Sequence, residues 1–306
     1  MRDDMLVPLS SHIDAQVYGG KAARLSETLC AGLPVPPGFA LHPDCVARTA
    51  KNSLLPNERA ALEHSLAQFK DGAVAVRSSA IGEDGASASF AGQHATFLNV
   101  RGLDEVLSAI ASVWASGQTE AARRYRARMS IANEPRVAVI VQALVPAEVA
   151  GVLFTVDPVS GSGERWMVEA SWGLGEAVVG GLVTPDRYVI ARTGELLERQ
   201  LGHKDVAMVA NEHGGMTELA IIDLARVQEA CLGEKALVRL AELGAACERL
   251  FGANQDIEWA LSSGTLYLLQ CRPVTSGGRL CGNCLNSVAW RQPWWLPVKE
   301  TCCRRC

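Results

Sequence analysis

Apolar residues recur along the chain at two spacings, one typical of helices and one typical of strands. From Lys21 to Ala31 they recur three and four residues apart, which predicts an amphipathic helix that ends at the Gly- and Pro-rich stretch 32–38. Residues 223–250 predict a long helix, or a pair of helices interrupted near Gly233 or Gly244. Short β-like runs predict strands at residues 74–79, 137–145, 151–156, 166–170, 187–191, 256–261 and 265–272.

Strands with long helices between them predict a mixed α+β fold. The chain changes character near residue 275, because Cys and Trp crowd into the stretch beyond it without the periodicity of a helix or a strand. We therefore expect a folded body over residues 1–275 and a poorly ordered Cys- and Trp-rich tail over residues 276–306.

Composition narrows the class of protein. A chain of 306 residues is long enough for a sizeable core, and 48% apolar with 20% charged residues excludes disordered, collagen-like and coiled-coil proteins. The net charge of −4 argues against non-specific binding to nucleic acid or to an anionic membrane. The longest apolar run, residues 137–145, is shorter than the roughly 20 residues that span a bilayer, and the acidic start leads into no secretory signal. We expect a cytoplasmic chain whose ten Cys are reduced.

The last two predicted strands form a hairpin that carries candidate chemistry. A three-residue loop, 262–264, pairs Leu261 with Thr265, which places Asp256 opposite Gln270 and Glu258 opposite Leu268. Asp256, Glu258, Gln270 and Arg272 then share one face, where oxygen ligands could hold a hard cation and the guanidinium a phosphate. The alternative is a solvated polar sheet face with an Asp–Arg pair. A four-residue loop would turn Gln270 to the other face.

Two further segments have the composition of phosphate-binding elements. Arg77 ends an apolar strand and precedes a loop of small residues, 80–91, whose backbone N–H groups could approach anionic oxygens. Lys21 follows two glycines at the predicted start of a helix, where anions are favoured. Neither is a Walker A motif, because GxxxxGK[ST] is absent. The alternative for both is an ordinary surface segment.

Taken together, five blocks of the chain resemble the nucleotide-binding domain of the phosphoenolpyruvate synthase, pyruvate phosphate dikinase and rifampicin phosphotransferase family. They include Val76-Arg-Ser-Ser79 and Asp256-Ile-Glu-Trp-Ala260, and they follow the family's order across roughly residues 15–275. The blocks are residues 19–25 with 32–39, 76–79 with 88–93, 141–142 with 150–158, 169–186, and 256–260 with 268–274.

The resemblance implies an ATP-grasp fold, in which ATP lies between two α+β lobes, here roughly residues 1–200 and 201–275. It implies roles for the residues at the matching positions. Lys21 and Arg77 would contact ATP phosphates, Gly92 and Thr96 would belong to the loop over them, Gln142 would lie near the adenine, Glu258 and Gln270 would hold Mg²⁺ with Asp256 nearby, and Arg272 would pair with a phosphate oxygen. Arg77 and Arg272 would be the catalytic residues.

Family enzymes also carry a swivelling domain whose phosphorylated His passes a phosphoryl group from ATP to an acceptor. The six His of this chain, at positions 12, 42, 64, 94, 203 and 213, do not stand in the Thr-Ser-His context that the family uses. We therefore expect a Mg-ATP-binding domain that needs a phosphohistidine domain and an acceptor-binding domain supplied in trans. The alternatives are a nucleotide-sensing module without turnover and an inactive gene fragment.

The tail permits two interpretations. Cys281 and Cys284, followed by Cys303 and Cys306, have the spacing of a zinc ribbon. The competing interpretation is a truncated or frame-shifted gene end, for which we expect no stoichiometric zinc. In the body, Cys271 stands where the family commonly has Ala or Thr, and we expect it to pack as a small apolar group.

Overall fold

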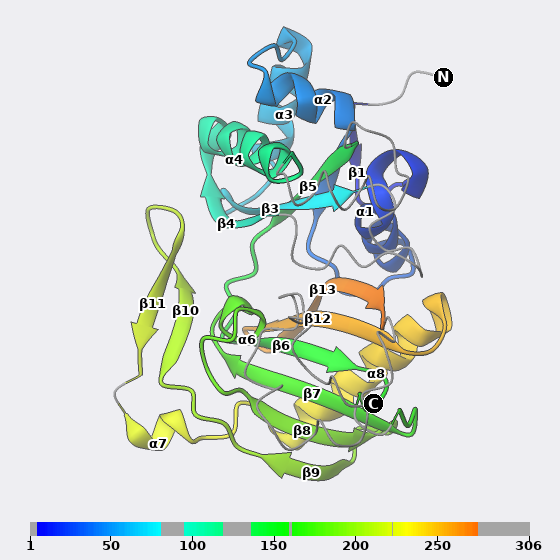
Figure 1. The fold of residues 1–306 in the computed structure, drawn as a ribbon, viewed down its shortest axis with the longest axis vertical. Helices are drawn as coiled ribbons and strands as arrows, with labels where there is room; N and C mark the ends of the chain where they lie inside the picture. Colours follow the sequence, from blue (N-terminus) through cyan, green and yellow to red (C-terminus); the bar gives the residue numbers. More distant parts are fainter. Residues whose placement is uncertain (1–4, 81–94, 119–135, 159–160, 222, 275–306) are drawn as a thin grey trace, which may run out of the picture.

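The chain folds into two lobes, each built on an antiparallel sheet (Figure 1). The computed structural model describes residues 5–80, 95–118, 136–158, 161–221 and 223–274. The α+β class is as the sequence predicts. The tail, with its four candidate zinc ligands, lies outside the described residues, as do Gly92 and His94.

The first lobe holds a five-stranded sheet of order β1-β2-β5-β3-β4. Helices α1, α2 and α4 pack on this sheet, and α3 packs on α4. The elements are β1 (Leu6–Pro8), α1 (Ala15–Cys30), β2 (Gly38–Leu41), α2 (Pro43–Ala50), α3 (Pro56–Leu66), β3 (Ala73–Ala80), β4 (Thr96–Arg101), α4 (Gly102–Ser116) and β5 (Val137–Ala143).

The second lobe holds a six-stranded sheet of order β13-β12-β6-β7-β8-β9 and a separate hairpin, β10-β11. Helix α8 covers one face of the large sheet. The elements are β6 (Val149–Phe154), β7 (Arg165–Trp172), α6 (Glu176–Val179), β8 (Asp186–Ala191), β9 (Leu196–Gln200), β10 (Val206–Ala210), β11 (Met216–Ala220), α7 (Leu224–Val227), α8 (Glu234–Phe251), β12 (Gln255–Ser262) and β13 (Thr265–Pro273).

One sequence expectation changes on this architecture, and one of the alternatives for residues 223–250 is confirmed. The sheets place the lobe boundary at residues 144–148 rather than near residue 200, because strands β6 to β9 hydrogen-bond into the sheet of β12 and β13. The helical stretch 223–250 is interrupted at Gly233, the N-cap of α8, and Gly244 lies inside α8. A Cβ at Gly244 would come within 2.6 Å of the Trp166 ring, so the glycine lets the helix approach the sheet.

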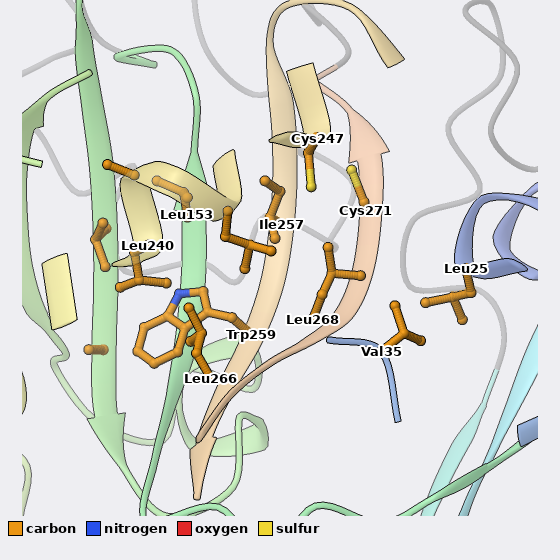
Figure 2. Close-up of a cluster of buried hydrophobic side chains, with 14 of the residues drawn as sticks. Leu25, Val35, Leu153, Leu240, Cys247, Ile257, Trp259, Leu266, Leu268 and Cys271 are labelled. Atoms are coloured by element: carbon orange, nitrogen blue, oxygen red, sulfur yellow. The ribbon is translucent and has the colours of Figure 1, made fainter. Parts of the chain in front are cut away.

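One hydrophobic core joins the lobes. Ile257, Trp259 and Leu268 turn toward α8, and Leu25 of the first lobe belongs to the same cluster (Figure 2). The backbone N–H of Leu268 donates to the carbonyl oxygen of Pro34 at 2.9 Å, which ties β13 to the segment after α1. Since alternate residues of a strand face opposite ways, Asp256 and Glu258 turn away from α8.

None of the helices within the described ranges is long and apolar enough to cross a membrane.

Candidate functional site

The β12–β13 hairpin carries its four polar residues on one face, but by a different route from the expected one. The loop has two residues, because Ser262 pairs with Thr265, and its two residues Ser263 and Gly264 both have positive φ, at 47° and 73°. This loop alone would place Asp256 opposite Cys271. A bulge between Glu258 and Trp259 adds one residue on β13 and restores the face, so that Glu258 lies opposite Gln270 and Asp256 opposite Arg272.

The bulge also supplies a contact to the other lobe. Leu269 is the residue of β13 left without an opposite residue on β12. Its carbonyl oxygen accepts a hydrogen bond from Nη1 of Arg77 at 2.8 Å. A bulged residue is released from regular pairing, so its carbonyl can be used in this way.

Arg77 reaches from β3 in the first lobe to Glu258 in the second. Its Nη2 lies 2.5 Å from Oε2 of Glu258, and both side chains are mostly buried. Burial by itself would raise the pKa of the Glu258 carboxyl, but the charges of Arg77, Arg272 and Lys21 and the hydrogen bond from Arg77 lower it below its usual value. Glu258 is therefore held as a carboxylate.

At Asp256, two residues earlier, burial raises the pKa by more than the neighbouring cation lowers it. Its Oδ2 accepts from Nε of Arg272 at 2.9 Å, and the whole residue is only 6% exposed. Burial raises the pKa of the Asp256 carboxyl, the Glu258 charge adds to that rise, and Arg272 offsets only part of it. Its other oxygen, Oδ1, is buried and has no hydrogen-bond partner among the described residues.

Glu169 lies on the same face of the sheet, and the sequence alone gave it no role. The register runs from Gln270 to Glu258, then Val152, Glu169 and Arg187, across five strands. Burial raises the pKa of Glu169, the Arg187 charge lowers it, and Asp256 raises it again, which places Glu169 within electrostatic reach of the hairpin residues. The signal for Glu169 in the sequence is a single carboxylate within the otherwise apolar run 166–170.

A fourth carboxylate comes from α6. Burial raises the pKa of Glu176, and the charges of Arg77 and Glu258 act on it with opposite signs. The short helix thus brings Glu176 close to the Arg77–Glu258 pair.

Lys21 lies where the helical part of α1 restarts. Gly19 interrupts α1 with φ 81° and ψ 162°, and a Cβ there would stand 2.4 Å from the carbonyl oxygen of Ser79. The Ser79 hydroxyl oxygen accepts from the backbone N–H of Ala22 at 3.1 Å. This close approach sets the start of the helix, and Lys21 with it, against the end of β3, two residues from Arg77. The Lys21 charge acts on Glu258.

Three further residues with an expected position are Thr96, Gln142 and Cys271. Thr96 is exposed at the start of β4, directly opposite Arg77 in the β3–β4 register. Gln142 is 2% exposed, and its side-chain amide donates to the carbonyl oxygen of Pro36 at 3.1 Å, so its proximity to an adenine remains a prediction. Cys271 is buried in the core beside Cys247 (Figure 2).

Asp186, from the block 169–186, holds the second lobe together. Its Oδ1 accepts from Nζ of Lys204 at 2.5 Å and from the backbone N–H of Gly202 at 2.8 Å, and Oδ2 accepts from the backbone N–H of Cys231 at 2.8 Å. Burial would raise the pKa of Asp186, but Lys204 and these donors lower it. A buried carboxylate with this many donors is a structural anchor.

The donor set on the hairpin face fits a magnesium ion. Glu258, Gln270 and Asp256 offer oxygen atoms, which Mg²⁺ prefers, and the buried Oδ1 of Asp256 lacks a partner. Within the described ranges, no three His, Cys, Asp or Glu side chains are grouped to hold a metal by themselves. Such a site therefore depends on Gln270 and on oxygens supplied by a phosphate, which is how Mg²⁺ is usually held beside a nucleotide.

Comparison with known proteins identifies, for most of the chain, the same family that the sequence motifs resemble. Residues 55–281 match the family described as pyruvate phosphate dikinase, AMP/ATP-binding domain. A rifampicin phosphotransferase of Streptomyces sviceus is 43% identical over 299 residues, covering 85% of this chain and 34% of that protein. A probable phosphoenolpyruvate synthase of Methanothermobacter thermautotrophicus is 37% identical, covering 87% and 45%. The prodigiosin synthesizing transferase PigC of Serratia marcescens is 37% identical, covering 90% and 34%.

The chain thus spans about a third to a half of the length of these curated relatives. Among solved structures, D-alanyl-alanine synthetase A from Vibrio cholerae is similar over 82% of this chain and 56% of that one, at 12% identity and a TM-score of 0.38. The family match covers well over half of the sequence, and the relatives cover most of it. The chain therefore belongs to the family of the pyruvate phosphate dikinase AMP/ATP-binding domain.

Proposed function

We propose that this chain binds Mg-ATP between its two lobes and passes a phosphoryl group to a His on a separate swivelling domain. The observation that carries the proposal is the contact of Arg77 with Glu258 across the lobes. It joins a guanidinium suited to phosphate to a carboxylate suited to a metal, and both lie beside Gln270, Asp256 and Arg272. The family to which the chain belongs supports a nucleotide as the ligand.

Each residue would act through its charge and position. Lys21, Arg77 and Arg272 would face the phosphate oxygens, and Arg77 would exchange Glu258 for a phosphate when the nucleotide enters. Glu258 and Gln270 would hold Mg²⁺ with Asp256 beside them. The metal, when bound, would neutralise charge on the phosphates. Phosphoryl transfer depends mainly on positioning and electrostatic stabilisation, so these groups would supply most of the rate.

The proposed reaction consumes ATP, water and the neutral imidazole of the acceptor His, and yields AMP, inorganic phosphate and phosphohistidine. None of the His within the described ranges stands on the hairpin face. His42 is buried against Tyr18 in the first lobe, for example, and His203 lies at an exposed bridge to Thr184. We propose that the acceptor His lies on a separate domain and that a third domain binds the final acceptor.

The test measures thermal stability and transfer with the same variants. Saturation with Mg-ATP at about 100 times Kd should add roughly 2.7 kcal/mol, because a ligand that binds only the folded chain stabilises it by mass action. Glu258→Gln should remove the part of that gain that depends on Mg²⁺. Glu63→Gln, on the exposed surface of α3, is the matched control and should leave it intact.

Transfer is measured with a separately supplied His domain from a related enzyme. Phosphohistidine should form with the unsubstituted chain, and Arg77→Ala should slow its formation by about 10²–10³, the usual loss for one charge-stabilising group. The chain alone should show no pyruvate- or rifampicin-dependent release of AMP. Binding of ATP without any transfer would favour a nucleotide-sensing module instead, and an unchanged melting curve would exclude both.

A further inference from the structure

The hairpin β10–β11 is a separate two-stranded sheet, and Met208 of β10 joins it to the second lobe by a parallel bridge to Gly173. Its two strands pair only with each other as a sheet, and β11 is exposed along its whole length. A two-stranded hairpin is marginally stable by itself. Its loop, residues 211–215, nevertheless reaches β4 of the first lobe (Figure 1).

Asn99 of β4 makes that contact with both its side chain and its backbone. Its Nδ2 donates to the carbonyl oxygens of Asn211 at 2.6 Å and Gly215 at 2.7 Å. Its own carbonyl oxygen accepts from the backbone N–H of Gly215 at 3.0 Å. Three hydrogen bonds therefore join one buried residue of the first lobe to the hairpin loop of the second.

The amide of Asn99 is fixed in the orientation that this contact needs. Its Oδ1 accepts from Nε of Arg101 at 3.2 Å, which leaves Nδ2 to face the loop. Asn99 is fully buried and has a φ of 54°, a left-handed conformation that few residues other than Gly and Asn adopt at low cost. Asn is thus suited to this position by its backbone as well as by its two donors.

The contact lies close to the candidate phosphate-binding residues. Asn99 is three residues along β4 from Thr96, and Thr96 pairs with Arg77 on β3. Leu98, between them, packs against Leu174 and Met208 of the second lobe. Holding Asn99 therefore holds the end of β3 and β4 that faces Glu258.

We propose that Asn99 and the β10–β11 loop form a latch that positions Arg77 and Thr96 against the second lobe for binding of a nucleoside triphosphate. This inference rests on the proposed function. Mg-ATP would break the Arg77–Glu258 contact by occupying both partners, whereas the latch uses no group that a nucleotide would take. The latch keeps the lobes in register while the ion pair is open, and Asn99 acts as a positioning residue.

The latch should matter for phosphates beyond the first. Arg77 is the expected contact of the ATP phosphates and Thr96 belongs to the expected loop over them, and AMP lacks two of those phosphates. Loss of the latch should therefore weaken ATP more than AMP, whereas a general loss of structure would weaken both equally.

The test uses Asn99→Asp in the whole chain. The substitution keeps the shape and the Arg101 contact, but turns a carboxylate oxygen toward two carbonyl oxygens. Asn99→Gly, which keeps the positive φ and removes both donors, is the second variant and guards against misfolding. Asn52→Asp is the matched control, because Asn52 has a φ of 52° and is exposed.

Hydrogen exchange of the hairpin amides and affinities for Mg-ATP and AMP are measured. Both Asn99 variants should speed exchange over residues 206–220 by about tenfold and weaken ATP by about tenfold, with AMP changed by less than twofold. Unchanged exchange in both variants would overturn the latch. Equal weakening of ATP and AMP, or unchanged ATP affinity, would overturn its positioning role. Failure of the unsubstituted chain to bind ATP would overturn the proposed function, and exchange would still decide whether the latch joins the lobes.

Discussion

Two carboxylates on one strand, Asp256 and Glu258, have pKa values shifted in opposite directions, because burial raises both but different cations face them. Glu258 is faced by Arg77 and Arg272, so its pKa falls despite burial. The Asp256 side chain is less exposed, at 8% against 20% for Glu258, and burial raises its pKa more than its partner Arg272 lowers it. A carboxylate kept ionised beside one that resists ionisation suits a site that gains a cation, because the cation favours the ionised form of both.

This contrast predicts opposite pH dependences of stability. A lowered pKa in the folded state contributes stability above the ordinary Glu value that is lost as pH falls through the folded pKa. Glu258→Gln should therefore cost about 1.5–3 kcal/mol at pH 7, the usual range for a hydrogen bond to a charged group, and progressively less below about pH 4.3.

Asp256→Asn should show the reverse trend. The free energy of unfolding of both variants and the parent is measured by urea titration across this pH range. A raised pKa contributes stability at low pH that is lost as pH rises through the folded pKa, so the variant should gain stability relative to the parent as pH rises. Parallel pH curves for the two variants would contradict this account of the site.

At the scale of elements, the join between α1 and β3 depends on a single glycine. Gly19 has φ 81° and lies where a Cβ would meet the backbone of Ser79. Gly32 has the same φ of 81° with no atom within 4 Å of a Cβ. The two positions therefore separate backbone strain from the close approach of two elements.

We expect Gly32→Ala to cost about 1 kcal/mol, the usual cost of a left-handed Ala. Gly19→Ala should cost at least about 2 kcal/mol more, because backbone atoms must also move, and it should displace Lys21 from the site. Chemical denaturation measures both. Equal losses at the two positions would show that the contact with Ser79 does not constrain α1.

The β12–β13 hairpin shows how far the sequence alone could lead. Pairing across an expected three-residue loop predicted which side chains share a face, and the structure confirms that face but not the pairing. The loop length and the bulge at Leu269 cancelled in their effect on that face, and neither has a strong local signal in Ser263-Gly264. Glu169, Arg187 and the Asn99 latch depend on which strands become neighbours, and local patterns do not determine that.

At the scale of the molecule, one hydrophobic cluster contains residues of both lobes. Leu25 of α1 shares a cluster with Trp259 and Leu268 of the second lobe, whereas Leu62 of α3 belongs to a cluster confined to the first lobe. Both leucines are buried in helices. Removing either side chain should thus lower the free energy of unfolding by a similar amount, but the two changes should affect different strands.

Leu25→Ala and Leu62→Ala should each destabilise by about 2–5 kcal/mol, the usual cost of removing a buried Leu side chain. Hydrogen exchange should separate them. Leu25→Ala should speed exchange in β12 and β13 as well as in β3 and β5, whereas Leu62→Ala should act mainly on the first lobe. Unchanged exchange in β12 and β13 of Leu25→Ala would mean that the lobes are held by polar contacts alone.

The pairing of Arg77 with Glu258 also has a consequence for synthesis of the chain. The two residues are 181 positions apart, so at about 5–20 residues per second a ribosome needs roughly 10–40 s to add the second after the first. During that interval β6 has emerged without β12, its neighbour, and presents an open edge to which other chains can pair. The nascent chain acquires Glu258 and Gln270 and covers that edge in the same step, when strands β12 and β13 leave the ribosome.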